Sequence, residues 1–406
     1  MNFAAIRPPR LRTVEEGERT ATWLELFYDL VFVAVVAVLA SRLAKDSSWL
    51  GWLSYAAYFA LVWWLWASHT FYADRYDTDD LIYRLVAAMQ MVAIAFIAAS
   101  LSSDEVAAST VAFAAAYAAA RIVLLLLYAR AYRHVVASRE LVRGYLIGHS
   151  VAAAMWVVSI FVPEPGRYWL WGIAFAVDLA TPFIMRRVQA RVPLDVSHLP
   201  ERFGLFTILV LGETIVAVTL GLGHVPWQWS TSIAGALGIL LATGIWWLHF
   251  DNLDGFVVRR RGQKTDWRPT AWIYSHLPLA IGLAMVGVGV EHAILAADAD
   301  HEYHTSDRWV LVGGMALAFA AMVVTTWASI RQENEVVGRR ILINRSFAVV
   351  VTLAIGAMTF MRPDLTLLCL VVVTAIAITV DMLARSVRIE DSEQPSPVEN
   401  EQAAGE

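Results

Sequence analysis

Two carboxylates, Glu25 and Asp29, stand at the start of an apolar stretch that reads Trp23-Leu-Glu-Leu-Phe-Tyr-Asp-Leu-Val-Phe. Because they are four residues apart, a helix places both on one face. Thr22 precedes Glu25 by three residues, and this spacing predicts a capping box with Glu25 at the level of the lipid headgroups. Asp29 would lie roughly 10 Å along the helix. An unpaired carboxylate facing lipid is costly at that depth, so Asp29 is a candidate for handling a proton or a cation, and Glu25 is a further candidate for the same path.

Glu213 is a second acid within an apolar run, and it follows Gly212. If its helix begins near Phe203, Glu213 lies roughly 15 Å into the membrane, close to the midplane. Gly212 leaves room for another helix to approach closely there. Two interpretations stay open for Glu213: an ion or proton site, or an interhelical hydrogen bond or salt bridge that fixes packing.

Asp178 and Arg121 are two further charged residues expected inside apolar runs. Thr181 and Pro182 follow Asp178, and a proline inside a membrane helix frees a backbone carbonyl where ions can bind. Asp178 and Arg121 are therefore candidates for an ion path. The alternative is a buried ion pair between Asp178 and Arg121, which would serve packing.

Histidine and aspartate residues gather where two apolar runs end. The members of this group are His69, Asp74, Asp77, His249, Asp251 and Asp254. Carboxylate oxygens and imidazole nitrogens are ligands that bind metal ions, but the spacing of these residues matches no established metal site. We expect an electronegative vestibule that concentrates cations, and neither a metal centre nor another cofactor.

Composition places the chain among polytopic membrane proteins, because 58% of the 406 residues are hydrophobic, 17% are charged and the mean hydropathy is +0.56. Cys369 is the single cysteine, so an intrachain disulfide is excluded. The sequence contains no G-x4-GK[ST] phosphate loop and no H-E-x-x-H. An ATP-driven pump and a zinc protease are thus disfavoured, and we expect the lipid bilayer rather than nucleic acid as the partner.

Twelve apolar runs are long enough to cross a hydrocarbon core of about 30 Å. They cover residues 23–43, 50–70, 81–101, 106–129, 142–162, 168–188, 203–223, 229–250, 270–291, 308–330, 343–361 and 364–384. Lys and Arg residues are unevenly distributed between the two sides of the predicted membrane. Counted with the adjoining span ends, 25 of the 31 lie in the amino-terminal segment, in the even-numbered gaps between spans and in the tail, and 5 lie in the odd-numbered gaps. The positive-inside rule therefore predicts that both termini are cytoplasmic.

The two halves of the chain resemble each other at a fixed offset of 180 residues. Matching pairs are Trp49 with Trp229, Trp66 with Trp246, His69 with His249, and Asp74 with Asp254. Six spans per half is an even number, so the predicted all-α fold is two parallel six-helix repeats. We expect a cytoplasmic segment at 1–21, without a cleavable signal peptide, repeats at 22–190 and 191–388, and a disordered acidic cytoplasmic tail at 389–406.

Three motifs resemble the bacterial low temperature requirement A family. They are Glu25-Leu-Phe-Tyr-Asp-Leu-Val-Phe, then Ala73-Asp-Arg-Tyr-Asp-Thr-Asp-Asp, then Glu201-Arg-Phe-Gly-Leu-Phe-Thr-Ile-Leu-Val-Leu-Gly-Glu. The resemblance extends from about Thr22 to Arg385. It implies a polytopic protein of the bacterial cytoplasmic membrane, linked by name to growth in the cold, and it carries no settled biochemical activity.

A fainter likeness connects Phe27-Tyr-Asp to the Phe-Ser-Asp pattern of lysosomal-type potassium channels, which also use six-helix repeats. Trp23 stands where those channels carry an arginine, and Thr207-Ile-Leu replaces the pattern in the second half. Potassium selectivity is therefore not carried over.

The leading hypothesis is a cation- or proton-coupled channel or transporter, with a path at the interface of the two repeats that Asp29 and Glu213 face. The alternative is a protein that does not transport: an accessory factor, or a lipid-acting enzyme that uses His69, Asp74, His249 and Asp254 at the cytoplasmic face.

Overall fold

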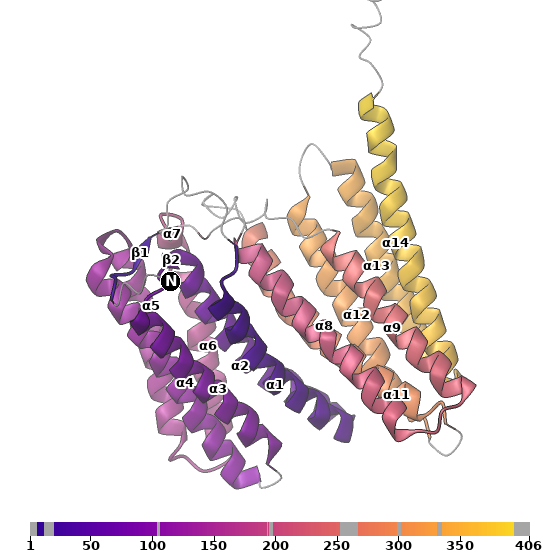
Figure 1. Cartoon of the computed structure of the whole chain (residues 1–406), viewed down its shortest axis with the longest axis horizontal. Coiled ribbons are helices and arrows are strands. Elements are labelled where there is room, and N and C mark those ends of the chain that lie inside the picture. Colours follow the sequence, from indigo (N-terminus) through magenta and orange to yellow (C-terminus); the bar gives the residue numbers. More distant parts are fainter. Residues whose placement is uncertain are drawn as a thin grey trace, which may run out of the picture. The chain divides into compact units, whose positions relative to one another are not determined.

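The structure is a computed structural model that describes residues 6–11, 20–103, 106–192, 194, 198–251, 267–298, 302–330 and 335–393. Almost all of this part of the chain is α-helical (Figure 1). The helices are α1 (Trp23–Lys45), α2 (Trp49–Arg75), α3 (Leu81–Ser102), α4 (Val106–His134), α5 (Arg139–Ser159), α6 (Gly166–Ile184), α7 (Arg186–Gln189), α8 (His198–His224), α9 (Trp229–Phe250), α11 (Arg268–Leu295), α12 (Thr305–Ser329), α13 (Glu335–Ala357) and α14 (Pro363–Glu393). Two short strands, β1 (Arg10–Leu11) and β2 (Tyr76–Asp77), pair antiparallel.

The prediction of an all-α polytopic membrane protein is confirmed. Among the described residues, eleven helices are long and apolar enough to span a bilayer. The sixth expected span corresponds to α6, which is more polar because Arg167, Asp178 and Pro182 interrupt it. Pro182 lies in the last turn of α6, so the helix ends at Ile184 instead of continuing to residue 188 with a kink.

Side-chain caps fix where the first helices begin. At α1, the Thr22 hydroxyl accepts from the backbone N–H of Glu25, and the Glu25 carboxylate accepts from the Thr22 N–H at 2.8 Å. This is the predicted capping box. Ser48 caps α2 by accepting from the Gly51 N–H, and Asp80 caps α3 by accepting from the Tyr83 N–H.

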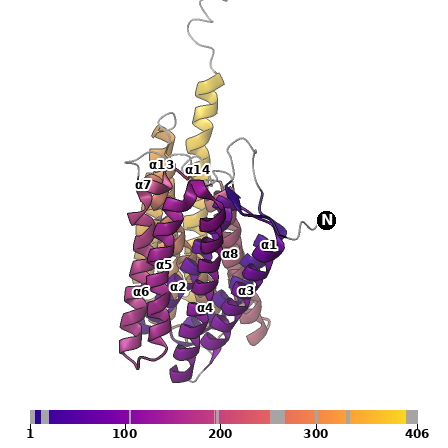
Figure 2. The same cartoon turned by 90° about the vertical axis from the view of Figure 1, so that its left-hand side faces the viewer.

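The described residues form two compact units, and the division falls within α8 after Glu213. The first unit contains the described residues up to Glu213 together with residues 267–270. In it, α1 packs against α2 and α3, and α3, α4, α5 and α6 follow one another side by side (Figure 2). The amino-terminal strand β1 is held at one end of this bundle by β2, in the register Arg10 to Asp77 and Leu11 to Tyr76.

The second unit contains residues 214–251 and the described residues from 271 onward. Within it, α9 packs against α14, and α13 packs against both α12 and α14. Helices α11 and α12 approach closely at glycines, since a Cβ added at Gly282 would lie 2.6 Å from the Gly314 carbonyl oxygen. Gly212, by contrast, has no atom of the described residues within 4 Å of such a Cβ, so the space that this glycine leaves is not filled by a neighbouring helix of its own unit.

Helix α14 continues to Glu393, five residues into the segment for which disorder was expected. Neither proline nor glycine occurs between Pro363 and Pro395, so nothing in this sequence interrupts the helix where the apolar residues end. Residues 394–406 lie outside the described residues.

Candidate functional site

Six side chains from three helices of the first unit come together and form what we call the acid–base cluster. Its members are Glu25 and Asp29 of α1, Trp66 and Asp74 of α2, and His198 and Arg202 of α8. All six are buried, at 2% exposure or less. The cluster therefore places three carboxylates, a guanidinium, an imidazole and an indole N–H where solvent does not reach them.

Asp29 is the innermost acid of the cluster on α1. Its Oδ1 atom accepts from the Arg202 guanidinium at 2.6 Å and from the Trp66 indole N–H at 2.7 Å. The other oxygen, Oδ2, is buried and has no hydrogen-bond donor among the described residues. A charge-assisted pair thus stabilises one oxygen of Asp29, while the second can accept a proton or a cation.

His198 connects two carboxylates. Its Nδ1 atom lies 3.0 Å from Oδ1 of Asp74, and its Nε2 atom lies 3.4 Å from Oε2 of Glu25. Arg202 lies one helical turn further along α8, with its guanidinium 3.4 Å from Oε1 of Glu25. The contacts therefore run without a break from Asp74 through His198, Glu25 and Arg202 to Asp29. Because His198 connects Asp74 with Glu25, protonation of the imidazole decides whether a positive charge lies between these two carboxylates.

The local sequence explains why these residues meet. Glu25 and Asp29 are four apart on α1, and His198 and Arg202 are four apart on α8, so each helix presents two ionisable groups on one face. The charge distribution along the sequence places Arg202 among the cytoplasmic cations, and nothing in the hydropathy pattern predicts a role for His198. Complementary spacing of two acids and two basic groups was the signal that could have found both. Glu25 caps α1 as predicted, and its carboxylate is buried against α8.

Aromatic side chains continue the cluster along α8. The Trp66 ring lies 4.2 Å from Phe206 and 5.0 Å from Phe203, measured between ring centroids. On the neighbouring part of α2, His69 stacks on Tyr28 at 4.0 Å and its Nε2 lies 3.4 Å from the Tyr83 hydroxyl.

His69 and Asp74 do not form the joint site that their pairing in the sequence suggested. They are five residues apart on the continuous helix α2, about 140° around its axis, and so lie on different faces. His69 meets Tyr28 and Tyr83, whereas Asp74 meets His198.

Glu213 lies eleven residues beyond Arg202, which is about 16 Å along α8 and returns to nearly the same face. Phe206 lies between them on that face. Because α8 begins at His198, five residues earlier than the sequence suggested, Glu213 is only two residues past the middle of the helix. Its side chain is 9% exposed.

Arg121 and Asp178 form a buried ion pair at 2.6 Å between α4 and α6. His149 of α5 lies 2.8 Å from the same Asp178 oxygen, and Arg121 also donates to the hydroxyl of Ser68 on α2. The structure thus contains the pair that the sequence offered as the alternative to an ion-path role. Four helices of the first unit meet at this second cluster.

The other described residues that were predicted for the vestibule have separate partners. His249 is buried against His276, with ring centroids 5.7 Å apart, and Asp251 is exposed beside Arg385. Asp254 and the side chain of Asp77 lie outside the described residues. Within the described ranges, no three His, Cys, Asp or Glu side chains are placed to hold a metal ion.

The acidic loop before α3 is tied to arginines. A two-point hydrogen bond from Arg84 lowers the pKa of Asp79. Burial raises the pKa of Asp80, but hydrogen bonds from Arg130 and from the Tyr83 backbone N–H outweigh burial, so the pKa lies below its usual value. Both carboxylates are therefore ionised and paired at neutral pH, which reduces the negative charge that the loop offers to cations.

Comparison with known proteins places the chain in a family. An uncharacterized protein of Rhizobium meliloti (strain 1021) is 25% identical over 313 residues, which cover 70% of this chain and 72% of that protein. The likeness to two-repeat potassium channels gains no support here and stays a prediction. Residues 20–380 match the family described as bacterial low temperature requirement A protein (LtrA). The match includes all three motifs noted in the sequence, and the chain belongs to the bacterial low temperature requirement A family.

Proposed function

We propose that this multi-pass membrane protein moves a proton or a small cation across the bacterial cytoplasmic membrane, along the face of α8 that carries His198, Arg202 and Glu213. The observation that carries the proposal is Asp29, a buried carboxylate with one oxygen held by Arg202 and Trp66 and the other without a donor among the described residues. Acids inside membrane segments are costly and mark ion or proton pathways.

The acid–base cluster would be the cytoplasmic part of the path. A proton bound at His198 can pass between Asp74 and Glu25, because both carboxylates contact the imidazole. Protonation of Asp29, or a cation at its Oδ2 atom, would weaken the ion pair with Arg202. Loading of the path would thereby loosen the contact between α1 and α8.

Phe206 and Trp66 would form the barrier between the cluster and Glu213. Their rings lie 4.2 Å apart, directly beyond the Asp29–Arg202 pair on α8. Trp66 is anchored by its hydrogen bond to Asp29, so loss of the Asp29 charge would release this ring. In this proposal, the charge on Asp29 thus controls whether the apolar barrier opens.

The test is flux through purified protein in liposomes. A potential set by potassium and valinomycin would drive protons past an internal pH dye, and separate preparations would measure sodium and potassium uptake. Wild type should exceed protein-free liposomes for at least one ion. Glu213→Gln keeps the size of the side chain and removes its charge, and should lower that flux about tenfold or more.

Glu140→Gln is the matched control, since Glu140 is an exposed acid of α5 paired with Arg191, and it should leave flux unchanged. Size-exclusion profiles would establish that each variant is folded. Absence of flux for every ion in folded wild type would contradict transport and favour the alternative of an accessory protein or a lipid-acting enzyme.

A further inference from the structure

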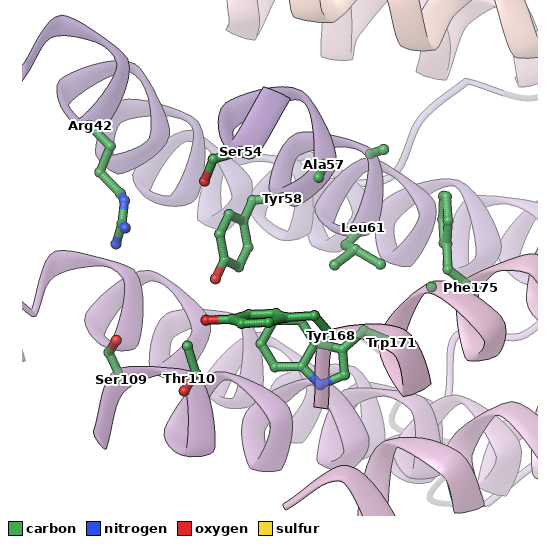
Figure 3. A pocket seen from close by; sticks show the side chains of 12 residues that line it. Arg42, Ser54, Ala57, Tyr58, Leu61, Ser109, Thr110, Tyr168, Trp171 and Phe175 are labelled. Carbon is green, nitrogen blue, oxygen red and sulfur yellow. The ribbon is translucent and has the colours of Figure 1, made fainter. Parts of the chain in front are cut away.

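A cavity of about 530 Å³ lies in the first unit at the helix ends opposite the acid–base cluster (Figure 3). Its walls come from the last turn of α1 and from the amino-terminal parts of α2, α4 and α6. Arg42 is nineteen residues beyond Trp23, or about 28 Å along α1, which is close to the thickness of the hydrocarbon core. The Arg42 end of the cavity is therefore at the level of the headgroups in the leaflet opposite the cluster, and the cavity extends from there toward the hydrocarbon core.

One end of the cavity is polar. Figure 3 shows the Arg42 guanidinium and the hydroxyls of Tyr58 and Tyr168 directed to the same end, where Ser109 also lies. Arg42 is the only charged residue among the described residues that line the cavity. It donates to the Leu101 carbonyl at 2.9 Å and lies 5.9 Å from the Tyr58 ring, and the described part of the chain gives it no carboxylate partner. A guanidinium with free donors in a half-buried setting recognises phosphate or carboxylate.

The other end of the cavity is apolar. Leu61, Trp171 and Phe175 form its wall, and Gly172 leaves space beside them. A charged end and an apolar end in one cavity of this size fit an amphiphilic anion.

A second, almost wholly apolar groove of about 720 Å³ runs between α3 and α4 and shares Ser109 with the cavity. Its rim includes Met89, Val92 and Phe96, each more than half exposed on the outer side of α3, where a bilayer would meet it. The groove can take an acyl chain from the bilayer while a headgroup stays near Arg42.

We propose that this cavity is a binding site for an anionic phospholipid, with the phosphate at Arg42 and an acyl chain against Trp171 and Phe175. Three features converge on this ligand: a cation that pairs with no carboxylate of the described residues, a polar end at headgroup depth, and a neighbouring groove that faces lipid. The assignment does not depend on the transport proposal.

Native mass spectrometry of delipidated protein, titrated with palmitoyl-oleoyl phosphatidylglycerol or phosphatidylcholine, tests the site. Wild type should retain phosphatidylglycerol preferentially. Arg42→Gln should weaken its binding about tenfold or more, because it removes a charged hydrogen-bond donor. Gly172→Leu should also weaken binding, since no atom lies within 4 Å of a Cβ at that position and the leucine would fill the cavity without displacing the protein.

Arg84→Gln is the control, because Arg84 is an exposed arginine at the opposite end of α3, and it should leave phosphatidylglycerol binding unchanged. Equal affinity for both lipids, or an unchanged affinity in both Arg42→Gln and Gly172→Leu, would overturn the proposal. Saturable binding of sn-glycerol 3-phosphate with the affinity of the lipid would also overturn it, because the site would then recognise a soluble anion.

Discussion

Ser68 and Leu248 stand 180 residues apart, and each accepts a hydrogen bond from a buried arginine. In the first unit, Arg121 donates to the Ser68 hydroxyl at 3.1 Å. In the second unit, Arg345 donates to the Leu248 carbonyl at 2.7 Å. Each arginine also holds a buried aspartate, Asp178 in one case and Asp381 in the other.

The offset of 180 is the one that the sequence comparison gave, and the accepting residues immediately precede His69 and His249. The two clusters differ in connectivity, because Arg121 comes from α4 whereas Arg345 comes from α13. In both clusters, however, the arginine binds the residue at the same position in the second helix of its predicted repeat. The parallel arrangement of the repeats stays a prediction, and these clusters favour a common origin for the two halves.

Arg121→Gln should destabilise the protein by about 3–5 kcal/mol, because Asp178 would stay buried without its cation. Arg121→Gln combined with Asp178→Asn should restore a large part of that loss, since no buried charge would be left unpaired. Unfolding in mixed micelles with increasing dodecyl sulfate, followed by circular dichroism, measures both. A double variant as unstable as the single one would contradict this account.

Phe206→Ala should increase ion leak through the protein, because it removes one of the two rings proposed to separate the acid–base cluster from Glu213. Liposome flux at a fixed potential is the measurement, with Phe161→Ala as the control on an exposed aromatic residue. Leak unchanged from wild type in a folded Phe206→Ala protein would show that the Trp66–Phe206 contact serves only packing.

Asp80 should contribute an acid-sensitive part of the stability. Its pKa is lowered in the folded protein, so its contribution is present above the unfolded pKa of about 3.9 and is lost as the pH falls below that value. Asp80→Asn should therefore lower the melting temperature at pH 7 and make a smaller difference near pH 3. Scanning fluorimetry at both pH values tests this, and an equal loss at both would contradict the role of the charge.

Gly314→Ala should destabilise the second unit, whereas Gly212→Ala should be tolerated. A Cβ at Gly314 would lie 2.7 Å from the Met285 side chain and 2.8 Å from the Gly282 carbonyl oxygen, and the backbone atom cannot move aside cheaply. At Gly212 a Cβ meets no atom within 4 Å, and alanine favours the helix by about 1 kcal/mol. Thermal unfolding of the two variants should therefore differ in sign. A melting temperature for Gly314→Ala equal to that of wild type would contradict the tight contact.

Much of the fold follows from the sequence by itself. Long apolar runs must become helices in a bilayer, because hydrocarbon offers the backbone no hydrogen-bond partners. Thr22 and Glu25 fix the start of α1 by local contacts, and three motifs were enough to indicate the family. Each of these features depends on residues that are close together in the chain or on average polarity.

The partners of the buried charges were decided only by the tertiary structure. Arg202 and Arg345 stand near the ends of apolar runs, where hydropathy cannot distinguish a cation at the membrane surface from one inside a bundle. Arg202 reaches Asp29 across 173 residues of chain, and this contact depends on the rotation and depth of α8 beside α1. Spacing within one helix determines which residues share a face, whereas the packing of side chains between helices determines which face they meet.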